Sequence, residues 1–369
     1  MAKSPLHELT EHGQSVWFDT LSRDLIQTGE LARMMDDDAV TGVTSNPTIF
    51  QKALSEGNAY DEDLKKLVAE TDDGREIFFS LALQDIRDAC DVLKPAYDAS
   101  NGIDGYVSME VEPGIAYDTE RSFEQARWIA KEVDRPNLYV KIPATEPGLP
   151  AIEDCIAAGT SINITLIFSL QRYAAVVEAY LRGLERLVAG GGDPSQVVSV
   201  ASFFVSRVDT EADKRLEAIG GEALELRGKL AVANAKLAYQ AWEEIFSGER
   251  WERLEARGAT NQRCLWASTS TKNPEYRDVL YVEELIGPKT VNTMPLETIE
   301  AFQDHGEVER TIDRDVDEAH RVFERIAAVG VDYDDVIATL EREGVEKFSD
   351  SFRELLDGVE SKRGQLVKA

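Results

Sequence analysis

The stretch SINITLIFSLQRYAAVVEAYLRGLERLVAG, residues 161–190, has the pattern of a β-strand followed directly by an amphipathic helix. Residues 161–168 carry apolar residues at alternate positions, and residues 169–190 repeat them at helical spacing. Similar short apolar runs occur at seven other places: residues 15–20, 40–47, 105–111, 138–143, 197–204, 263–269 and 290–295. Strands alternating with helices predict parallel pairing, and eight such units in one chain predict an α/β fold of the (β/α)8 TIM-barrel type.

The structural alternative is a doubly wound open sheet, whose usual mark is a glycine-rich turn after the first strand. The only glycine run, Gly190–Gly192, follows a helical pattern and is typical of a helix C-terminus. We therefore expect one barrel domain over residues 1–369. The segments 51–104 and 208–262 are longer than one helix needs, which predicts additional helices. Acidic C-terminal helices are expected from about residue 306, covering either the barrel mouth or an outer face.

Charge is the outlying property of the composition. The chain has 69 acidic against 40 basic residues, a net charge of −29, and its apolar fraction of 43% is enough for a sizeable core. Such a surface repels nucleic acid and anionic lipid, so neither is an expected partner. The N-terminus has no apolar signal segment, and no run long enough to span a membrane occurs. A cytoplasmic protein is expected.

Metal and histidine chemistry are both poorly supported. The three cysteines are widely spaced and have no zinc-ligand or disulfide pattern. The four histidines, His7, His12, His305 and His320, lie in polar, helical or terminal segments rather than beside the apolar strands. We expect no cofactor and a chemistry that does not use histidine.

A lysine stands in the middle of the strand-like run LYVKIP, residues 138–143. Alternation places Val140 and Ile142 on one face and Lys141 on the other. Other runs alternate similarly, although buried parallel strands are usually almost continuously apolar. In a barrel the polar face points inward, and its residues near the C-terminal strand ends lie where barrel enzymes build their sites. The predicted inward set is Asp19, Asn46, Glu110, Lys141, Asn163, Thr165 and Ser202.

A lysine in such a pocket loses hydration, so its pKa should fall. A neutral amine is a nucleophile that forms a Schiff base with a carbonyl. The carboxylates of Glu110 and Asp19 could move protons to and from substrate hydroxyls. The protonated imine is itself the electron sink, so no metal is needed. The plain alternative for Lys141 is a structural ion pair with Glu110 or Asp19.

Five motifs in register on successive predicted strands resemble those of the transaldolase family, in its longer bacterial form. They are GVTSNPTIF, VSMEVEPGIAYDTERS, LYVKIPAT, SINITLIFS and LWASTSTKNPEY. The resemblance runs from about residue 14 to residue 300 and less distinctly to the end. It implies a Schiff-base enzyme of the non-oxidative pentose phosphate pathway. Its reaction would move a dihydroxyacetone unit from sedoheptulose 7-phosphate to glyceraldehyde 3-phosphate, giving erythrose 4-phosphate and fructose 6-phosphate.

The resemblance also implies roles for individual residues. Lys141 matches the Schiff-base lysine, and Glu110 matches the glutamate that works with a catalytic water. Thr165 matches the threonine that helps to hold this water. Asp19 matches the acid/base at the donor's C–C bond. The positions that would bind donor hydroxyls are Asn46, Asn163 and Ser202.

The donor phosphate needs cationic partners, which this acidic chain must place locally. Arg207 matches a phosphate-binding arginine, whose fork suits phosphate, and Ser268 matches a phosphate-contacting serine. The better-known short form has an arginine soon after that serine, whereas this chain has Lys272, which offers a point charge but no fork. Phe204 falls on an aromatic of the site's rim, although a core position suits it equally. The plain alternative for Arg207 is a surface arginine at a helix start.

Two other functions stay open from the sequence. A fructose-6-phosphate aldolase-type lyase would split the same bond and release free dihydroxyacetone, but those relatives are much shorter and lack the glutamate that matches Glu110. A non-catalytic barrel acting as a binding protein would instead use the acidic surface. The expected partners are sugar-phosphate substrates, without nucleic acid or membrane, and a monomer or homodimer is expected.

Overall fold

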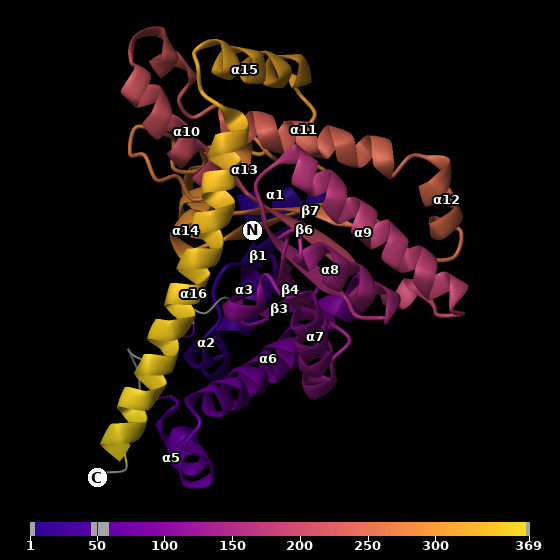
Figure 1. Cartoon of the computed structure of the whole chain (residues 1–369), viewed down its shortest axis with the longest axis vertical. Coiled ribbons are helices and arrows are strands. Elements are labelled where there is room, and N and C mark those ends of the chain that lie inside the picture. Colours follow the sequence, from indigo (N-terminus) through magenta and orange to yellow (C-terminus); the bar gives the residue numbers. More distant parts are fainter. Residues whose placement is uncertain (1–3, 46–49, 51–58, 367–369) are drawn as a thin grey trace.

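Eight parallel strands close into a barrel in the computed structural model, which describes residues 4–45, 50 and 59–366 (Figure 1). The strands follow one another in chain order, and β1 pairs with β8 to close the barrel. Each predicted run contains one strand, so the predicted (β/α)8 fold is confirmed. The strands are β1 (Gln14–Phe18), β2 (Val40–Thr44), β3 (Tyr106–Glu110), β4 (Leu138–Pro143), β5 (Ile162–Ile167), β6 (Ser199–Phe204), β7 (Arg263–Ala267) and β8 (Thr290–Met294).

Helices surround the barrel, and additional ones occupy the two long segments where they were predicted. The helices before β6 are α1 (Pro5–Glu11), α2 (Arg23–Gln27), α3 (Glu30–Asp37), α5 (Asp61–Glu70), α6 (Gly74–Ala99), η1 (Pro113–Ile115), α7 (Thr119–Val133), α8 (Gly148–Ala157), α9 (Leu170–Ala189) and η2 (Pro194–Gln196). Those after β6 are α10 (Val205–Ile219), η3 (Gly221–Leu226), α11 (Leu230–Ile245), α12 (Glu249–Glu255), α13 (Leu280–Glu283), α14 (Leu296–His305), α15 (Val316–Ala328) and α16 (Tyr333–Leu366). No helix in these described ranges is long and apolar enough to cross a membrane.

The unit of β5 and α9 shows why the local sequence folds this way. Ser169 caps α9, because its hydroxyl accepts a hydrogen bond from the Arg172 backbone N–H at 3.0 Å. The helix buries a stripe that includes Tyr173 and Tyr180. It ends at the predicted glycine run, where Gly191 has a φ of 81°, a backbone conformation that favours glycine.

Strand register brings the central lysine beside polar residues of its neighbours. Lys141 on β4 pairs with Glu110 on β3 and with Asn163 on β5. The alternate residues Val140 and Ile142 are fully buried, and β4 contacts α7 and α8 on its outer side. The apolar face of β4 therefore meets helices, and its polar face points inward.

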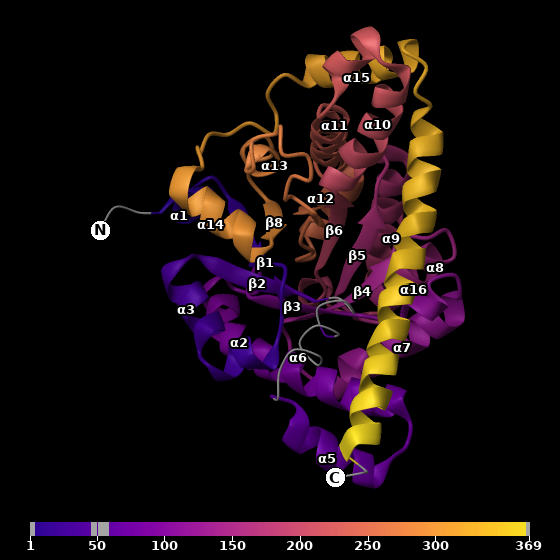
Figure 2. The same cartoon turned by 90° about the vertical axis from the view of Figure 1, so that its left-hand side faces the viewer.

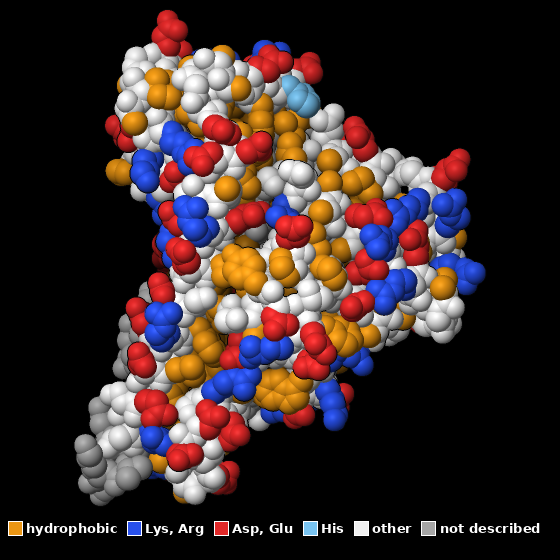
Figure 3. Space-filling model, in the orientation of Figure 1, with side chains coloured by type: hydrophobic (Ala, Val, Ile, Leu, Met, Phe, Trp, Pro, Cys, Tyr) orange, Lys and Arg blue, Asp and Glu red, His pale blue; other side chains and the backbone are white. Residues whose placement is uncertain are grey.

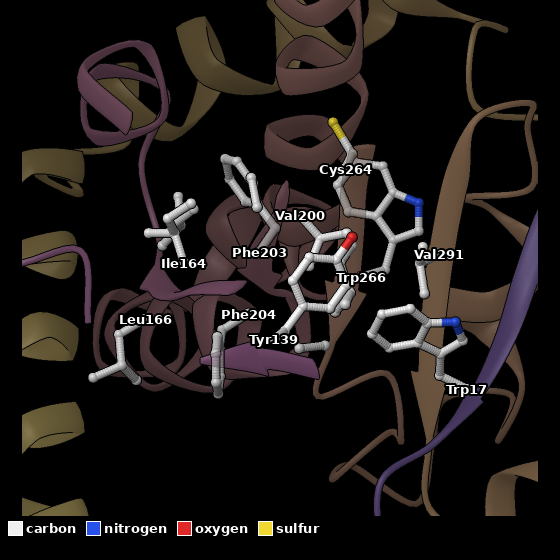
Figure 4. Packing of buried hydrophobic residues seen from close by; sticks show 14 of the residues in the cluster. Trp17, Tyr139, Ile164, Leu166, Val200, Phe203, Phe204, Cys264, Trp266 and Val291 are labelled. Carbon is white, nitrogen blue, oxygen red and sulfur yellow. The ribbon is translucent and has the colours of Figure 1, made fainter. Parts of the chain in front are cut away.

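An aromatic layer fills the barrel interior beneath this lysine. Tyr139, two residues before Lys141, lies with its ring centroid 6.0 Å from that of Trp17 (Figure 4). The ring centroids of Tyr139 and Tyr106 lie 4.2 Å apart. All three aromatic residues are almost fully buried. A side chain at Gly42 would collide with the Trp17 indole, so only glycine fits there. The layer closes the floor of the barrel below Lys141.

The two acidic C-terminal helices take different places. α15 packs on α11, an outer helix, whereas the 34-residue α16 runs across the C-terminal end of the barrel (Figure 2). On its way α16 contacts α10, β5, η1, α6 and α5. α15 thus covers an outer face, and α16 covers the mouth of the barrel. On the face drawn in Figure 3, acidic and basic side chains are interspersed.

Candidate active site

A cavity of about 80 Å³ lies at the C-terminal end of the barrel. Strand ends and the loops that follow them supply most of its wall, as expected for a barrel enzyme. The predicted residues that line it are Asp19, Lys141, Thr165, Ser202, Phe204, Arg207 and Ser268. Most of this wall therefore consists of residues that strand alternation and the family motifs mark in the sequence.

Lys141 is buried at the centre of the site. Its side chain is 7% exposed, and its Nζ lies 3.5 Å from Glu110 Oε2. The ammonium also donates a hydrogen bond to the Ser45 backbone carbonyl at 3.2 Å. This contact is the ion pair of the structural alternative, but Lys141 also lines the cavity, which a purely structural pair does not require.

The carboxyl group of Glu110 has a pKa close to neutral pH. Burial raises its pKa to about 7, although the nearby charges of Lys141 and Arg207 oppose this shift. Asp19 raises the pKa further by like-charge repulsion. A carboxyl that titrates near pH 7 both donates and accepts protons readily at that pH.

Asp19 follows β1 and is held by Thr44, which in turn contacts Thr293; the sequence interpretation missed both threonines. The Thr44 hydroxyl donates to Asp19 Oδ1 at 2.6 Å, and the hydroxyls of Thr44 and Thr293 lie 2.8 Å apart. The Asp19 backbone N–H also donates to the Met294 carbonyl at 2.9 Å. Both threonines line the cavity, and their only sequence signal is a polar residue near a strand end.

Two of the predicted hydroxyl-binding residues, Asn163 and Ser202, form a hydrogen-bonded chain with Ser108 along the inner wall. Ser202 Oγ donates to Asn163 Oδ1 at 2.7 Å, and Asn163 Nδ2 donates to Ser108 Oγ at 3.1 Å. Asn163 is fully buried and supports Ser202 rather than lining the cavity itself. The buried Thr165 Oγ1 has no hydrogen-bond partner within the part of the chain that the structure describes, so it is available to a water or substrate.

Arg207 supplies a partly buried cation at the start of α10. Its guanidinium carbon lies 4.6 Å from the Phe204 ring centroid, and both residues line the cavity. Burial lowers the pKa of Arg207, although Asp19 and Glu110 act against this shift. No described carboxylate lies within ion-pair distance of the guanidinium, so its fork is available to an anion. Phe204 belongs to both the core and the rim, since it is 8% exposed and lies 5.5 Å from Phe168.

Ser268 is fixed by an unusual backbone conformation at the end of β7. Its φ of 58° lies in the left-handed region, which is strained for a residue with a side chain. The Ser268 carbonyl accepts a hydrogen bond from the Ser206 backbone N–H at 3.0 Å, and the two hydroxyl oxygens lie 3.1 Å apart. These contacts tie the end of β7 to the start of α10, which carries Arg207.

Lys272 is a predicted phosphate-site residue that the structure does not bring into this cavity. Lys272 is exposed, and its ammonium donates to Ser270 Oγ at 2.7 Å. It is absent from the cavity wall. Asn46 lies outside the described residues.

The wall also contains a residue from a distant part of the chain. Phe348 of α16 lines the cavity together with Lys141 and Arg207. No local signal marks it in the sequence, because it is one of several apolar residues at helical spacing.

Comparison with known proteins decides the family. Residues 16–359 match the family model described as Transaldolase/Fructose-6-phosphate aldolase. The chain belongs to the transaldolase family. It is 54% identical over 365 residues to a transaldolase from Parafrankia sp. (strain EAN1pec), covering 98% of this chain and 99% of the relative. A transaldolase from Mycolicibacterium smegmatis is 53% identical over the full length of both chains, and one from Acidothermus cellulolyticus is 53% identical over 96% of each.

Full-length identity to these transaldolases confirms the predicted class of enzyme. The chain is an enzyme with transaldolase function, and the Schiff-base mechanism is general to its family. The rival interpretation as a non-catalytic barrel is thereby set aside. The lyase is named in the same family model, but the full-length relatives named above are transaldolases.

Proposed function

We propose that this transaldolase carries a dihydroxyacetone unit on Lys141, from sedoheptulose 7-phosphate to glyceraldehyde 3-phosphate. The observation that carries the proposal is the 3.5 Å distance between the Lys141 amine and the Glu110 carboxyl. The amine lines a cavity that also exposes Asp19 and Arg207. A nucleophile, two proton carriers and a cation for the phosphate are thus assembled in one place.

The first step forms the imine. Lys141, in its amine form, attacks the C2 carbonyl carbon of the donor, and one proton passes from the nitrogen to the carbonyl oxygen, which becomes a hydroxyl. Protonated Glu110 gives its proton to this hydroxyl, which leaves as water while the C2=N bond forms. Thr165, whose hydroxyl lacks a protein partner in the described chain, holds that water.

The second step breaks the C3–C4 bond of the donor. Asp19 takes the proton of the C4 hydroxyl, and C4 becomes the carbonyl carbon of erythrose 4-phosphate. The electron pair of the broken bond forms C2=C3, and the C=N electrons return to the nitrogen. Thr44 orients the Asp19 carboxylate for this transfer through its 2.6 Å hydrogen bond.

The acceptor then reverses these events. C3 of the enamine attacks the aldehyde carbon of glyceraldehyde 3-phosphate, and the aldehyde oxygen takes the proton back from Asp19. Ionised Glu110 then removes a proton from the water held by Thr165, and the resulting hydroxide adds to C2. The C–N bond breaks, which releases fructose 6-phosphate and restores Lys141.

Arg207 and Ser268 bind the donor phosphate, and Ser202, supported by Asn163, binds donor hydroxyls. Asn46 is proposed for the same hydroxyl-binding role from its motif alone. Lys272 is proposed as a secondary cation, which would have to leave Ser270 to reach the phosphate. We further propose a cytoplasmic monomer or homodimer without nucleic-acid or membrane partners, in keeping with the net charge of −29.

The proposal is tested by trapping the imine. The enzyme is incubated with fructose 6-phosphate, reduced with borohydride and digested. The masses of the resulting peptides are then measured by mass spectrometry. A mass increase is expected on the peptide that contains Lys141, and its absence would reject the Schiff-base assignment. A parallel assay with and without erythrose 4-phosphate separates transfer, which needs the acceptor, from simple cleavage.

The phosphate site gives a prediction of its own. Arg207→Lys should raise the KM for fructose 6-phosphate by roughly 10–100-fold, because the two-pronged guanidinium contact with phosphate is lost. Borohydride trapping with dihydroxyacetone, which has no phosphate, should be unchanged. Steady-state kinetics and the trapping yield measure the two effects.

Two comparisons sharpen this test. Arg182→Lys removes a half-exposed surface guanidinium, 3.2 Å from Glu153, and should leave the KM unchanged. Lys272→Ala should raise the KM much less than Arg207→Lys, because the structure leaves Lys272 outside the cavity wall. If Arg207→Lys weakened trapping by dihydroxyacetone equally, the arginine would be positioning the site rather than binding phosphate.

A further inference from the structure

One face of α16 carries a continuous apolar stripe toward the barrel. Val345, Phe348, Phe352, Leu355 and Val359 recur at intervals of three and four residues, so they share one side of the helix. Val345, Leu355 and Val359 are buried. The helix is therefore seated on the barrel along its length.

Two phenylalanines of this stripe reach the reacting groups. Phe348 lines the cavity that contains Lys141 and Arg207. Phe352, one turn later, borders a second small cavity beside Glu110, and its ring packs edge-on against Phe78 at 5.5 Å. The helix thus places one aromatic ring in the wall of the cavity that contains Lys141 and another in the wall of the cavity beside Glu110.

Contacts on both sides of these rings fix the position of the helix. Toward its N-terminal end, Asp335 lies 2.7 Å from Arg215. Glu341 lies 3.2 Å from Arg172. Toward its C-terminal end, Lys362 lies 2.8 Å from Asp61.

Between these anchors the helix lies close against β5. Gly344 approaches Leu166 so closely that an added Cβ would lie 3.2 Å from the leucine side chain. A helix held at both ends and in such close contact cannot easily draw its rings away from the site.

We propose that Phe348 is a specificity-determining residue that keeps bulk solvent from C3 of the lysine-bound enamine and so directs the three-carbon unit to an aldehyde acceptor. The inference rests on the proposed function, because it concerns the enamine formed on Lys141. It adds a role for α16, which lies outside the eight βα units that hold the reactive groups.

Two reactions compete for this enamine once the first aldehyde has left. In transfer, C3 of the enamine attacks an aldehyde carbon, as described above. In the competing reaction C3 takes a proton from solvent, which regenerates the iminium. One water then adds to C2 and the C–N bond breaks, leaving free dihydroxyacetone and the Lys141 ammonium. Both routes use one water at C2, but only the competing route takes a proton from solvent at C3. An apolar ring in the cavity wall that keeps bulk solvent from C3 therefore disfavours the competing route.

The test is the ratio of dihydroxyacetone released to three-carbon unit transferred, measured on the full chain with fructose 6-phosphate and erythrose 4-phosphate. Phe348→Ala should raise this ratio by about tenfold or more, the scale expected when a hydrophobic wall is removed. Phe348→Leu keeps an apolar group of smaller area, so its ratio should lie between those of wild type and Phe348→Ala. The ratio is independent of how much enzyme is active, so a loss of stability alone does not change it.

A matched control separates the site from general loosening of the C-terminal helices. Phe323 on α15 is also half-buried and packs edge-on against Tyr333 at 5.0 Å, but it does not line the cavity. Phe323→Ala should leave the ratio at the wild-type value. An equal rise in this variant would overturn the proposal, as would an unchanged ratio in Phe348→Ala. If Phe348→Ala does not fold, an unchanged ratio in Phe348→Leu would overturn it.

The borohydride experiment distinguishes this failure from failure of the proposed function. An adduct on Lys141 in wild type and variants, together with an unchanged ratio, rejects the role of Phe348 alone. Absence of the adduct in wild type rejects the Schiff-base assignment and, with it, the inference.

Discussion

Lys141→Ala should lower the rate of transfer by roughly 10⁵–10⁶-fold, the scale on which removal of a covalent nucleophile acts. Within the described chain Lys141 is the only lysine that lines the cavity, so no neighbouring amine can form the imine. The barrel should nevertheless fold. Glu110, whose pKa burial already raises to about 7, would take up a proton rather than remain as an unpaired buried charge. A coupled assay for erythrose 4-phosphate formation and circular dichroism measure the two properties.

The chain offers a matched control for this variant. Lys236 on α11 is as buried as Lys141, at 6% exposed, and its Nζ lies 3.0 Å from Glu284 Oε2. Lys236→Ala therefore removes a similar ion pair outside the cavity and should keep both turnover and the trapped adduct. Wild-type turnover in Lys141→Ala would refute the assignment of Lys141.

Glu110→Gln should slow turnover by roughly 10²–10⁴-fold, because the amide keeps the shape of the carboxyl but cannot exchange a proton. Imine formation should persist, though more slowly. The wild-type rate should depend on pH near 7, where the Glu110 pKa lies, and this dependence should disappear in the variant. Rate profiles across pH 5–9 and borohydride trapping measure these effects.

The same variant has a consequence for stability. Because burial raises the pKa of Glu110 from 4.5 to about 7, the folded state binds this proton more tightly than the unfolded state. The contribution of Glu110 to stability is therefore fully present below pH 4.5, falls as the pH rises toward 7 and is constant above that. Glu110→Gln should remove this decline in stability with rising pH. Urea unfolding at several pH values measures the effect.

Glu112 provides the control, because it is also buried and belongs to the same motif. Its carboxylate accepts a hydrogen bond from Arg75 Nε–H at 2.6 Å. Glu112 does not line the cavity that contains Lys141. Glu112→Gln should weaken folding while it leaves the pH dependence of turnover in place. Unchanged turnover in Glu110→Gln would move the proton-transfer role to Asp19.

The strands and the reactive pair could be predicted because both leave a local mark. A charged residue between Val140 and Ile142 contradicts a buried strand unless its face is inward and functional. Glu110 and Thr165 are marked by the same alternation, together with the family motifs. These signals depend only on neighbours in sequence, so they do not require the tertiary structure.

The remaining parts depend on long-range geometry. Phe348 reaches the site only because α16 crosses the barrel mouth, which nothing near residue 348 encodes. Thr44 and Thr293 resemble ordinary strand threonines until β1, β2 and β8 are brought side by side. The short distance along the chain from Ser268 predicts Lys272 near the phosphate, whereas the loop leaves Lys272 exposed at the surface.

The aromatic layer of Trp17, Tyr106 and Tyr139 limits the direction from which substrates reach Lys141. Since it closes the barrel below Lys141, the donor, the acceptor and every water reach the amine from the side on which α16 lies. The first aldehyde must therefore leave through the same opening by which the second arrives. The two sugar phosphates exchange in succession, and the enzyme holds only the three-carbon fragment between these events.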